Sequence, residues 1–454
     1  MSDDKAPVTM LVETVDQSTA GANTRRTIGR GAVSDEENLY LVGDASTVDA
    51  INAEFYGHFP YPWRPTNFLY PSHGAMASAM LGQNLGDWDG TLIPKRPKIW
   101  VAGCGTNQAV HTALHFPLAT IVGSDLSKPS LDLCASTLRS MGLRNAELRN
   151  ESLNTVPYDG AFDIIVCTGV IHHNSDPQAT LWKLTRALKP GGVMELMVYN
   201  RFHRVMNAAV QKAVRLLTGG AFDGGWEAQM RLLNHVIGAL PNESDAAKHV
   251  AQFQGQPDAR IADSLLQPVE HSYTVESLHE LVRACGLEIV TYHVSEWDKA
   301  DDRVFWNMRW ADRDLQARYD ALPDLTRWQI SNLLMAEQSP MLWFYLQRAD
   351  SGRPIKSEPQ IVDEFLDRRF RRTESTQRCY ILQDNGEYRL SAKQIPYAGM
   401  PATGLYRHVL DLSDGRLTFR EVFEQCGATP DFENASRARV SLATSAFPFL
   451  RAVQ

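Results

Sequence analysis

Residues 99–108 read Ile-Trp-Val-Ala-Gly-Cys-Gly-Thr-Asn-Gln, an apolar run that passes through Gly-x-Gly into a polar segment. This pattern predicts a buried strand, a tight reversal and the first turn of a helix. Glycine at the reversal allows positive φ angles and lets a bound group approach the backbone closely. The free N–H groups at the start of the helix favour a negative ligand group. The stretch therefore predicts one strand-turn-helix unit of an α/β sheet.

The same alternation of apolar runs and helical patterns continues to residue 199. Helices are expected near residues 108–116, 129–141 and 177–188, the last with Asp176 as its N-cap and Pro177 in its first turn. Strands joined by helices of this length predict a parallel sheet with crossover connections. Buried strands are expected at 99–102, 120–123, 146–148, 163–167 and 193–198.

The changing pattern along the chain predicts four parts. A helix capped by Thr274 should lead to a further strand at 287–294, which an apolar run at 341–346 could pair with. The expected parts are a flexible arm at 1–45, an aromatic cover segment at 46–95, a Rossmann-like domain at 96–350 with helical insertions at 200–272 and 297–338, and a small C-terminal α+β domain at 374–454.

Composition and charge exclude several classes of protein. Hydrophobic residues make up 44% of the chain, and 45 basic against 53 acidic side chains give a net charge of −8. Nucleic acid is not expected as a partner, because phosphate backbones require a dominant basic surface. The one basic cluster is interpreted as a solvated helix face; it consists of Arg368, Arg369, Arg371 and Arg372.

The six cysteines are scattered, without metal-ligand spacing, so neither a metal site nor a disulfide framework is expected. The sequence has no signal-peptide pattern and no apolar run of membrane-spanning length. A cytoplasmic location without membrane association is therefore expected.

Asp125 stands 22 residues after Gly103, at the end of the next expected strand. A carboxylate there can accept hydrogen bonds from both hydroxyls of a ribose, which is a better interpretation than a helix N-cap or a turn acid once the glycine turn precedes it. Two nucleoside ligands fit, a dinucleotide and S-adenosylmethionine. Dinucleotide sites favour a third glycine, and Gln108 occupies that position here.

Further motifs distinguish these ligands. Residues 162–173 read Phe-Asp-Ile-Ile-Val-Cys-Thr-Gly-Val-Ile-His-His, and residues 188–192 read Leu-Lys-Pro-Gly-Gly. Together with the first motif they resemble the class I S-adenosylmethionine-dependent methyltransferase family, in particular its bacterial branch with AGCGT, CTGVxHH and LKPGG motifs. The resemblance is close over residues 95–200 and looser over 270–350. It implies a seven-stranded Rossmann-like sheet whose last strand is antiparallel.

The resemblance also implies roles for individual residues. The glycine turn would border the methionine part of the cofactor, Asp125 would hold the ribose, and the loop after the third strand would lie near the adenine. Many relatives carry an acid where Val101 stands and a glycine where Asn107 stands, so the contacts of the methionine ammonium differ here. The implied cofactor-binding residues are Gly103, Cys104, Gly105, Thr106, Asn107, Asp125, Leu126, Glu151, Ser152 and Thr168, with Tyr56 added from the cover segment.

Candidate general bases are His172, His173 and Tyr199. The alternative for the histidines is that one packs under the strand loop and the other faces solvent. His203, Glu270 and His271 are further candidates beside the 200–272 insertion. A base is needed only if the acceptor begins protonated, because the sulfonium is already activated and in-line positioning supplies much of the rate.

Two other segments carry hypotheses. Tyr56, Tyr61 and Trp63 could stack over the sulfonium or wall the acceptor pocket, or they could be core aromatics of an added element. Residues 412–422 are similar to the helix–turn–helix of small winged-helix modules of the PqqD type, with a structural or dimerisation role as the alternative.

The resulting hypothesis is an S-adenosylmethionine-dependent methyltransferase that acts on a small-molecule or peptide acceptor. Two alternatives stay open. The first is an enzyme that uses the same cofactor for aminocarboxypropyl transfer or cyclisation, and the second is a non-catalytic cofactor-binding scaffold. The sequence leaves the acceptor and the oligomeric state open.

Overall fold

A computed structural model of the chain describes residues 44–217, 225–295, 306–374, 376–395, 404–444 and 449–453. Nearly all of the expected arm at 1–45, and the beginning of the insertion expected at 297–338, lie outside the described residues. Within the described residues, no helix is both long and apolar enough to cross a membrane.

A seven-stranded mixed sheet forms the centre of the protein, in the order β4-β3-β2-β5-β6-β8-β7. Strands β2 to β6 are parallel to one another, and β8 is antiparallel to both β6 and β7. This order confirms the predicted Rossmann-like fold with an antiparallel last strand. The strands are β2 (Lys98–Ala102), β3 (Thr120–Asp125), β4 (Ala146–Asn150), β5 (Phe162–Thr168), β6 (Leu188–Val198), β7 (Leu287–Tyr292) and β8 (Leu342–Arg348).

Helices cover both faces of this sheet, because parallel strands are buried on both sides. On one face α5 (Pro177–Ala187), α10 (Val275–Ala284) and α13 (Asp324–Met335) pack on a core that contains Trp100, Phe162 and Phe344. On the other face α3 (Gln108–His115) and α4 (Lys128–Ser140) pack on Ile99, Val101 and Ile164. As predicted, the Asp176 carboxylate caps α5 by accepting from the Ala179 N–H at 2.9 Å.

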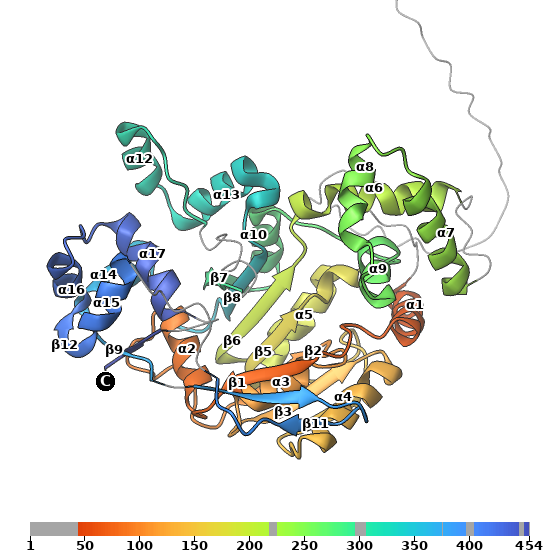
Figure 1. Cartoon of the computed structure of the whole chain (residues 1–454), viewed down its shortest axis with the longest axis horizontal. Helices are drawn as coiled ribbons and strands as arrows, with labels where there is room; N and C mark the ends of the chain where they lie inside the picture. The colour runs from red at the N-terminus through yellow and green to blue at the C-terminus, as the bar shows by residue number, and fades with distance from the viewer. Residues whose placement is uncertain are drawn as a thin grey trace, which may run out of the picture. The chain divides into compact units, whose positions relative to one another are not determined.

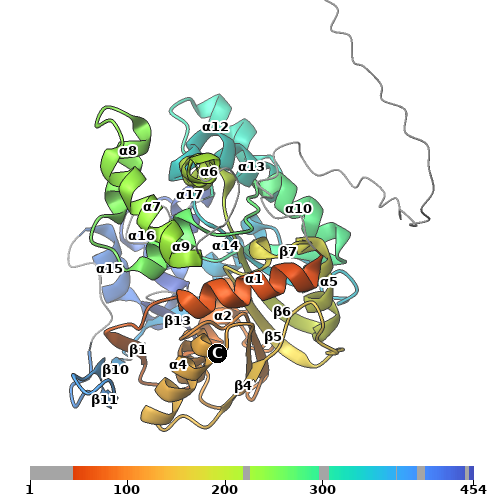
Figure 2. The same ribbon diagram turned by 90° about the vertical axis from the view of Figure 1, so that its right-hand side faces the viewer.

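The cover segment begins with α1 (Ala45–His58), which ends directly before the first of the prolines. Its Phe55 and Phe59 share a hydrophobic core with Val210, Leu233 and Leu265 of the insertion. Figures 1 and 2 both show α1 beside α9. The insertion is thus a helical layer that the cover helix joins. Its helices are α6 (Arg201–Leu217), α7 (Gly225–Ala239), α8 (Asp245–Val250) and α9 (Asp258–Leu265).

The C-terminal part adds two small sheets. Strand β1 (Asn67–Pro71) of the cover pairs with β10 (Gln377–Leu382), which also pairs with β11 (Tyr388–Leu390). Strand β9 (Arg369–Arg372) lies between β12 (Asp414–Thr418) and β13 (Leu450–Ala452). The surrounding helices are α14 (Glu358–Asp367), α15 (Leu405–Leu412), α16 (Phe419–Gln425) and α17 (Phe432–Ala443), and their core includes Trp88 from the segment that follows α2 (Met76–Asn84).

Glu195 is a carboxylate placed within the sheet, in β6. Its Oε1 accepts from the Trp343 Nε1–H at 2.9 Å, and His293 Nε2 lies 3.8 Å from the same oxygen. Burial raises the pKa of Glu195 from 4.5 to about 7. Because the pKa is higher in the folded state, the folded protein keeps this proton at pH values between 4.5 and about 7, where the unfolded chain has lost it. The stability contribution of this group is therefore full below pH 4.5 and is lost as the pH rises toward about 7.

We predict that Glu195→Gln raises the free energy of unfolding at pH 8 by on the order of 3 kcal/mol, because it removes a buried charge. At pH 4.5 the two proteins should differ little. Thermal or urea unfolding at both pH values measures the effect, with the exposed Glu243→Gln as control. Equal stabilisation at both pH values would show that Glu195 does not titrate in this range.

Candidate active site

The glycine turn after β2 has the backbone geometry that the sequence predicts. Gly103 and Gly105 have φ angles of 75° and 51°, in the left-handed region that favours glycine. A Cβ on Gly103 would lie 2.5 Å from Val170 Cγ2, and one on Gly105 would lie 2.5 Å from the Tyr61 carbonyl oxygen. Both positions therefore exclude any larger residue.

The N–H groups of the turn are already used inside the protein. Those of Gly103 and Cys104 donate to the Ser124 carbonyl at 2.8 and 2.9 Å, and that of Gly105 donates to Asp125 Oδ2 at 2.8 Å. These three N–H groups shape the turn. They precede α3, so the prediction for the N–H groups at the start of the helix does not concern them.

Thr106 attaches the cover segment to the turn. Its N–H donates to the Tyr61 carbonyl at 3.2 Å, and its hydroxyl donates to the Pro62 carbonyl. Asn107 is the N-cap of α3, although its side chain makes no capping hydrogen bond. The Cys104 side chain is buried in the core beneath the turn.

Asp125 ends β3 with a half-buried carboxylate. Oδ1 accepts from the Ser127 N–H and Oδ2 from the Gly105 N–H, both at 2.8 Å. Burial raises the pKa of Asp125 against the opposing effect of these N–H groups. Ser127 rather than Asp125 is the N-cap of α4. A carboxylate has about four lone-pair positions, so this one keeps capacity for both hydroxyls of a ribose.

The neighbouring loop residues are held by the protein. The side chain of Asn150 donates to the carbonyls of Asp125 and Leu126, each at 2.9 Å. Glu151 Oε1 accepts from the hydroxyls of Ser124 and Tyr158, each at 2.5 Å. The Ser152 hydroxyl donates to Asp49 of α1. The Glu151 and Ser152 side chains thus fix the loop and the cover, and half-exposed Thr168 stands at the end of β5.

A buried acid lies above the ends of β5 and β6. Asp263 of α9 is 6% exposed and accepts from the Tyr56 hydroxyl at 3.0 Å and from the Tyr199 hydroxyl at 3.2 Å. Burial raises the pKa of Asp263, and burial together with Asp263 raises the pKa values of Tyr56 and Tyr199 well above their usual range. Sequence reasoning missed Asp263, although an acid on the apolar face of α9, beside Ala262 and Leu265, was a usable signal.

The two candidate histidines are both buried, so the alternative in which one of them faces solvent is wrong. The His173 Nδ1 lies 2.9 Å from the Val269 carbonyl, whereas Nε2 has no hydrogen-bond partner among the described residues. Neither ring nitrogen of His172 has such a partner there, and its ring lies 3.9 Å from that of Tyr199. Burial lowers the pKa values of both, that of His172 most strongly.

An ion pair closes this cluster. Arg204 Nε donates to Glu270 Oε1 at 2.7 Å and Nη2 to Oε2 at 2.6 Å, and the guanidinium lies 4.2 Å from the centroid of the Tyr199 ring. Burial alone would raise the pKa of Glu270, but Arg204 overrides it and lowers the pKa. Glu270 is therefore poorly suited to accept a proton.

The other predicted residues lie in different settings. His203 Nε2 lies 2.9 Å from the Ser339 carbonyl, and the His271 N–H donates to the His172 carbonyl at 2.8 Å. Trp63 is 40% exposed and touches Tyr61 edge-to-face, with centroids 6.1 Å apart. No group of three or more potential metal-ligating side chains occurs among the described residues.

Comparisons with known proteins show which domain and which fold this chain resembles. Residues 100–196 match the family model described as methyltransferase domain. A protein from Synechococcus is 27% identical over 309 residues, which cover 64% of this chain and 70% of that protein. Trans-aconitate 2-methyltransferase from Deinococcus radiodurans is 31% identical over 129 residues, 27% of this chain and 47% of its own.

Among solved structures, PKMT2 from Rickettsia typhi has a TM-score of 0.53 at 14% identity, covering 86% of this chain and 77% of its own. Its complex with AdoHcy has a TM-score of 0.51 at 15% identity, covering 83% and 76%. At such identity the likeness shows the fold alone. With the domain match, the chain is an S-adenosylmethionine-dependent methyltransferase, and S-adenosylmethionine is its cofactor.

We predict that Asp125→Ala weakens binding of S-adenosylhomocysteine by at least about tenfold, because each hydrogen bond to a charged group contributes roughly 1.5–3 kcal/mol. The substitution also removes the acceptor of two backbone N–H groups, so a thermodynamic cycle is needed. Calorimetry should show that the wild type binds S-adenosylhomocysteine much more tightly than its 2′,3′-dideoxy analogue, whereas the variant binds the two ligands with almost the same affinity.

The exposed Asp132→Ala is the matched control, since Asp132 pairs with Lys128 on the surface of α4. If the variant distinguishes the two ligands as strongly as the wild type does, the ribose is bound elsewhere.

Proposed function

We propose that the protein transfers the methyl group of S-adenosylmethionine to an acceptor bound beside Tyr56, Tyr199 and Asp263. The position of Tyr56 carries this proposal. Its backbone carbonyl accepts from the Ser127 hydroxyl at 3.0 Å, next to Asp125, while its own hydroxyl donates to Asp263 at 3.0 Å. One residue thus connects the proposed ribose site with the cluster of buried titratable side chains.

The proposed cofactor site comprises the glycine turn, Asp125, Leu126 and Thr168. When bound there, the cofactor supplies an activated sulfonium methyl group. Glu151 and Ser152 support the loop, and the aromatic cover over the turn would exclude water from the reacting atoms. Ring faces of Tyr56 or Tyr61 near a cation would add cation–π attraction.

His173 is the proposed proton acceptor. Its Nδ1 lies beside the Val269 carbonyl, an arrangement that places the ring proton on Nδ1 and leaves the Nε2 lone pair available. The lowered pKa keeps the ring neutral at neutral pH. Its role fits an oxygen or nitrogen acceptor that begins protonated. Burial, together with the charge of Asp263, raises the pKa values of Tyr56 and Tyr199 and keeps their phenols protonated, so these residues orient the acceptor rather than remove its proton.

The acceptor itself is to be found by incubating the protein with methyl-labelled S-adenosylmethionine and fractionated metabolite and peptide extracts. Methyl transfer yields S-adenosylhomocysteine and a labelled acceptor. Methylthioadenosine as the nucleoside product would contradict the proposal, because it indicates aminocarboxypropyl transfer or cyclisation.

With the acceptor fraction found in this way, Tyr199→Phe and Asp263→Asn should lower turnover roughly 10- to 100-fold, the range for lost positioning of a reacting group. Affinity for S-adenosylhomocysteine should stay unchanged, because neither side chain contacts the turn or Asp125. Tyr380→Phe in β10, whose hydroxyl donates to the Met141 carbonyl, is the control. Unchanged turnover in both variants would place the acceptor elsewhere.

The rate of the wild type should be level from neutral pH upward and fall only below the ordinary histidine pKa of about 6.5, since the pKa of His173 is lowered. His173→Gln should reduce turnover and abolish this fall in rate at acidic pH (the acidic limb of the pH–rate profile), whereas His172→Gln should keep the limb. A limb that persists in His173→Gln belongs to another group.

We also propose that the C-terminal module begins at Ser357, earlier than the boundary at 374. Phe365 of α14 lies 4.2 Å from Phe419 of α16, centroid to centroid, within one core. Truncation after Lys356 should leave affinity for S-adenosylhomocysteine within about threefold, since no proposed cofactor residue is removed. The Tm should fall, because Arg327 and Tyr292 lose Glu358. An aggregated or cofactor-blind product would show that the module belongs to the main core.

A further inference from the structure

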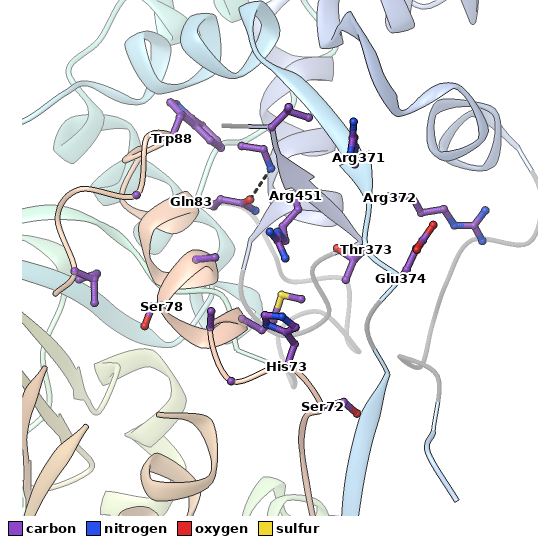
Figure 3. Close-up of a pocket in the computed structure, with 18 of the residues that line it drawn as sticks. Ser72, His73, Ser78, Gln83, Trp88, Arg371, Arg372, Thr373, Glu374 and Arg451 are labelled. Atoms are coloured by element: carbon purple, nitrogen blue, oxygen red, sulfur yellow. Dashed lines mark hydrogen bonds between the residues drawn. The ribbon is translucent and has the colours of Figure 1, made fainter. Parts of the chain in front are cut away.

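A cavity of about 1370 Å³ lies between α2, with the loops around it, and the sheet β12-β9-β13 (Figure 3). Its walls include Pro97, just before β2, and Ala119, just before β3. These are the amino-terminal ends of the parallel strands, at the edge opposite the proposed methyl-transfer site. No residue assigned to that site lines the cavity.

Two exposed arginines on neighbouring strands belong to one wall. Arg371 of β9 and Arg451 of β13 are directly opposed in the antiparallel register. Like charges in this position destabilise a sheet. On the other side of Arg371 its register partner is Asp414 of β12, which forms an ion pair with Arg416 rather than with Arg371. Within the described residues neither guanidinium has an ion-pair partner. On β12, Gly415 leaves the space that the Arg371 side chain occupies, because a Cβ there would lie 2.7 Å from Arg371 Nε.

The other charged side chains of the lining are mostly engaged. Arg372 Nη1 lies 3.5 Å from Asp411 Oδ1, and Arg416, outside the lining, lies 3.4 Å from Asp414. The Asp87 carboxylate accepts from the N–H groups of Thr91 and Leu92. The remaining charged side chains of the lining are Lys95 and the exposed Glu374, and His73 lines the cavity from the loop before α2.

Thr373 gives a second, independent indication of a ligand. It lines the cavity, it is 8% exposed, and its Oγ1 has no hydrogen-bond partner among the described residues. A buried hydroxyl without a partner costs roughly 1–3 kcal/mol, so it is retained at the expense of stability. In Figure 3 Thr373 lies near the side chains of Arg451 and His73.

We propose that this cavity is a docking site for an extended acidic peptide, whose carboxylates bind Arg371 and Arg451 and accept from the Thr373 hydroxyl. A guanidinium group matches a carboxylate in geometry as well as charge. The volume exceeds the roughly 300–1,000 Å³ typical of small-molecule pockets. Apolar walls formed by Met76, Ile93, Phe116 and Leu118 suit the non-acidic side chains of a peptide. The proposal stands independently of methyl transfer.

The test uses the full chain and a fluorescein-labelled hexaglutamate peptide with blocked ends, with hexaglutamine as the uncharged comparison. Fluorescence anisotropy should show binding of hexaglutamate at low salt that weakens as salt is added, despite the net charge of −8 of the chain. Arg371→Gln with Arg451→Gln should weaken it at least tenfold. Arg416→Gln is the matched control, because this arginine is 87% exposed on β12 and does not line the cavity.

Thr373→Val distinguishes a ligand contact from a structural role. It should lower peptide affinity severalfold while the Tm stays the same or rises, because the hydroxyl has no internal partner to lose. Equal affinity of the double variant and the wild type would overturn the proposal. A second result would also overturn it: millimolar inorganic phosphate displaces the peptide completely, and free glutamate binds with the same affinity as the peptide. The site would then hold small anions only. Unchanged binding of S-adenosylhomocysteine in all variants separates this test from that of the proposed function.

Discussion

The contact between Gly105 and the Tyr61 carbonyl is the constraint on which the rest of the site depends. A side chain at position 105 would lie 2.5 Å from that oxygen, so the cover can cross the turn only because glycine stands there. Thr106 then holds the crossing with its N–H and its hydroxyl. Since the chain between this point and α1 is short, the crossing also fixes the position of the cover helix.

From that position α1 reaches two loops at the carboxyl edge of the sheet and helix α9 of the insertion. Asp49 accepts from Ser152, the Asn52 side chain donates to the His173 carbonyl at 2.7 Å, and Tyr56 bonds Asp263. The insertion contributes Asp263 and the ion pair of Arg204 with Glu270, and both are buried. Burying these charges is costly unless each has partners, and here every one has them. The polar cluster therefore forms only when cover, sheet and insertion are assembled together.

The sheet could be predicted because parallel strands are buried on both faces and so appear as continuous apolar runs, as at 162–168. The glycine turn and Asp125 could be predicted because their chemistry is local. The extent of α1 could not, because the prolines at 60 and 62 dominate the pattern of the cover, whereas the helix ends just before them.

Contacts between residues far apart in the sequence could not be predicted from local sequence patterns. Asp263 accepts hydrogen bonds from the hydroxyls of Tyr56 and Tyr199, which are 207 and 64 positions away in the sequence. Strand β1 pairs with β10 across some three hundred residues. The expected adenine-loop side chains illustrate the same limit. The sequence predicts that Glu151 binds the cofactor because it follows a strand. In the structure its Oε1 accepts hydrogen bonds from Ser124 and Tyr158, and the spacing of these residues in the sequence does not show that they meet.

The cover segment reaches both the carboxyl edge and the amino edge of the sheet, as its contacts show. Tyr61 and Pro62 hold it at the glycine turn, β1 pairs with β10 in its middle, and α2 with its flanking loops walls the cavity at the opposite edge. The Gln83 side chain of α2 in turn bonds the backbone of residues 443, 450 and 452. A ligand can influence a distant site only through an element that both sites contact and whose arrangements they favour differently. Among the described elements, the cover segment meets the first of these conditions, because it supplies Tyr56 to one edge and α2 to the other.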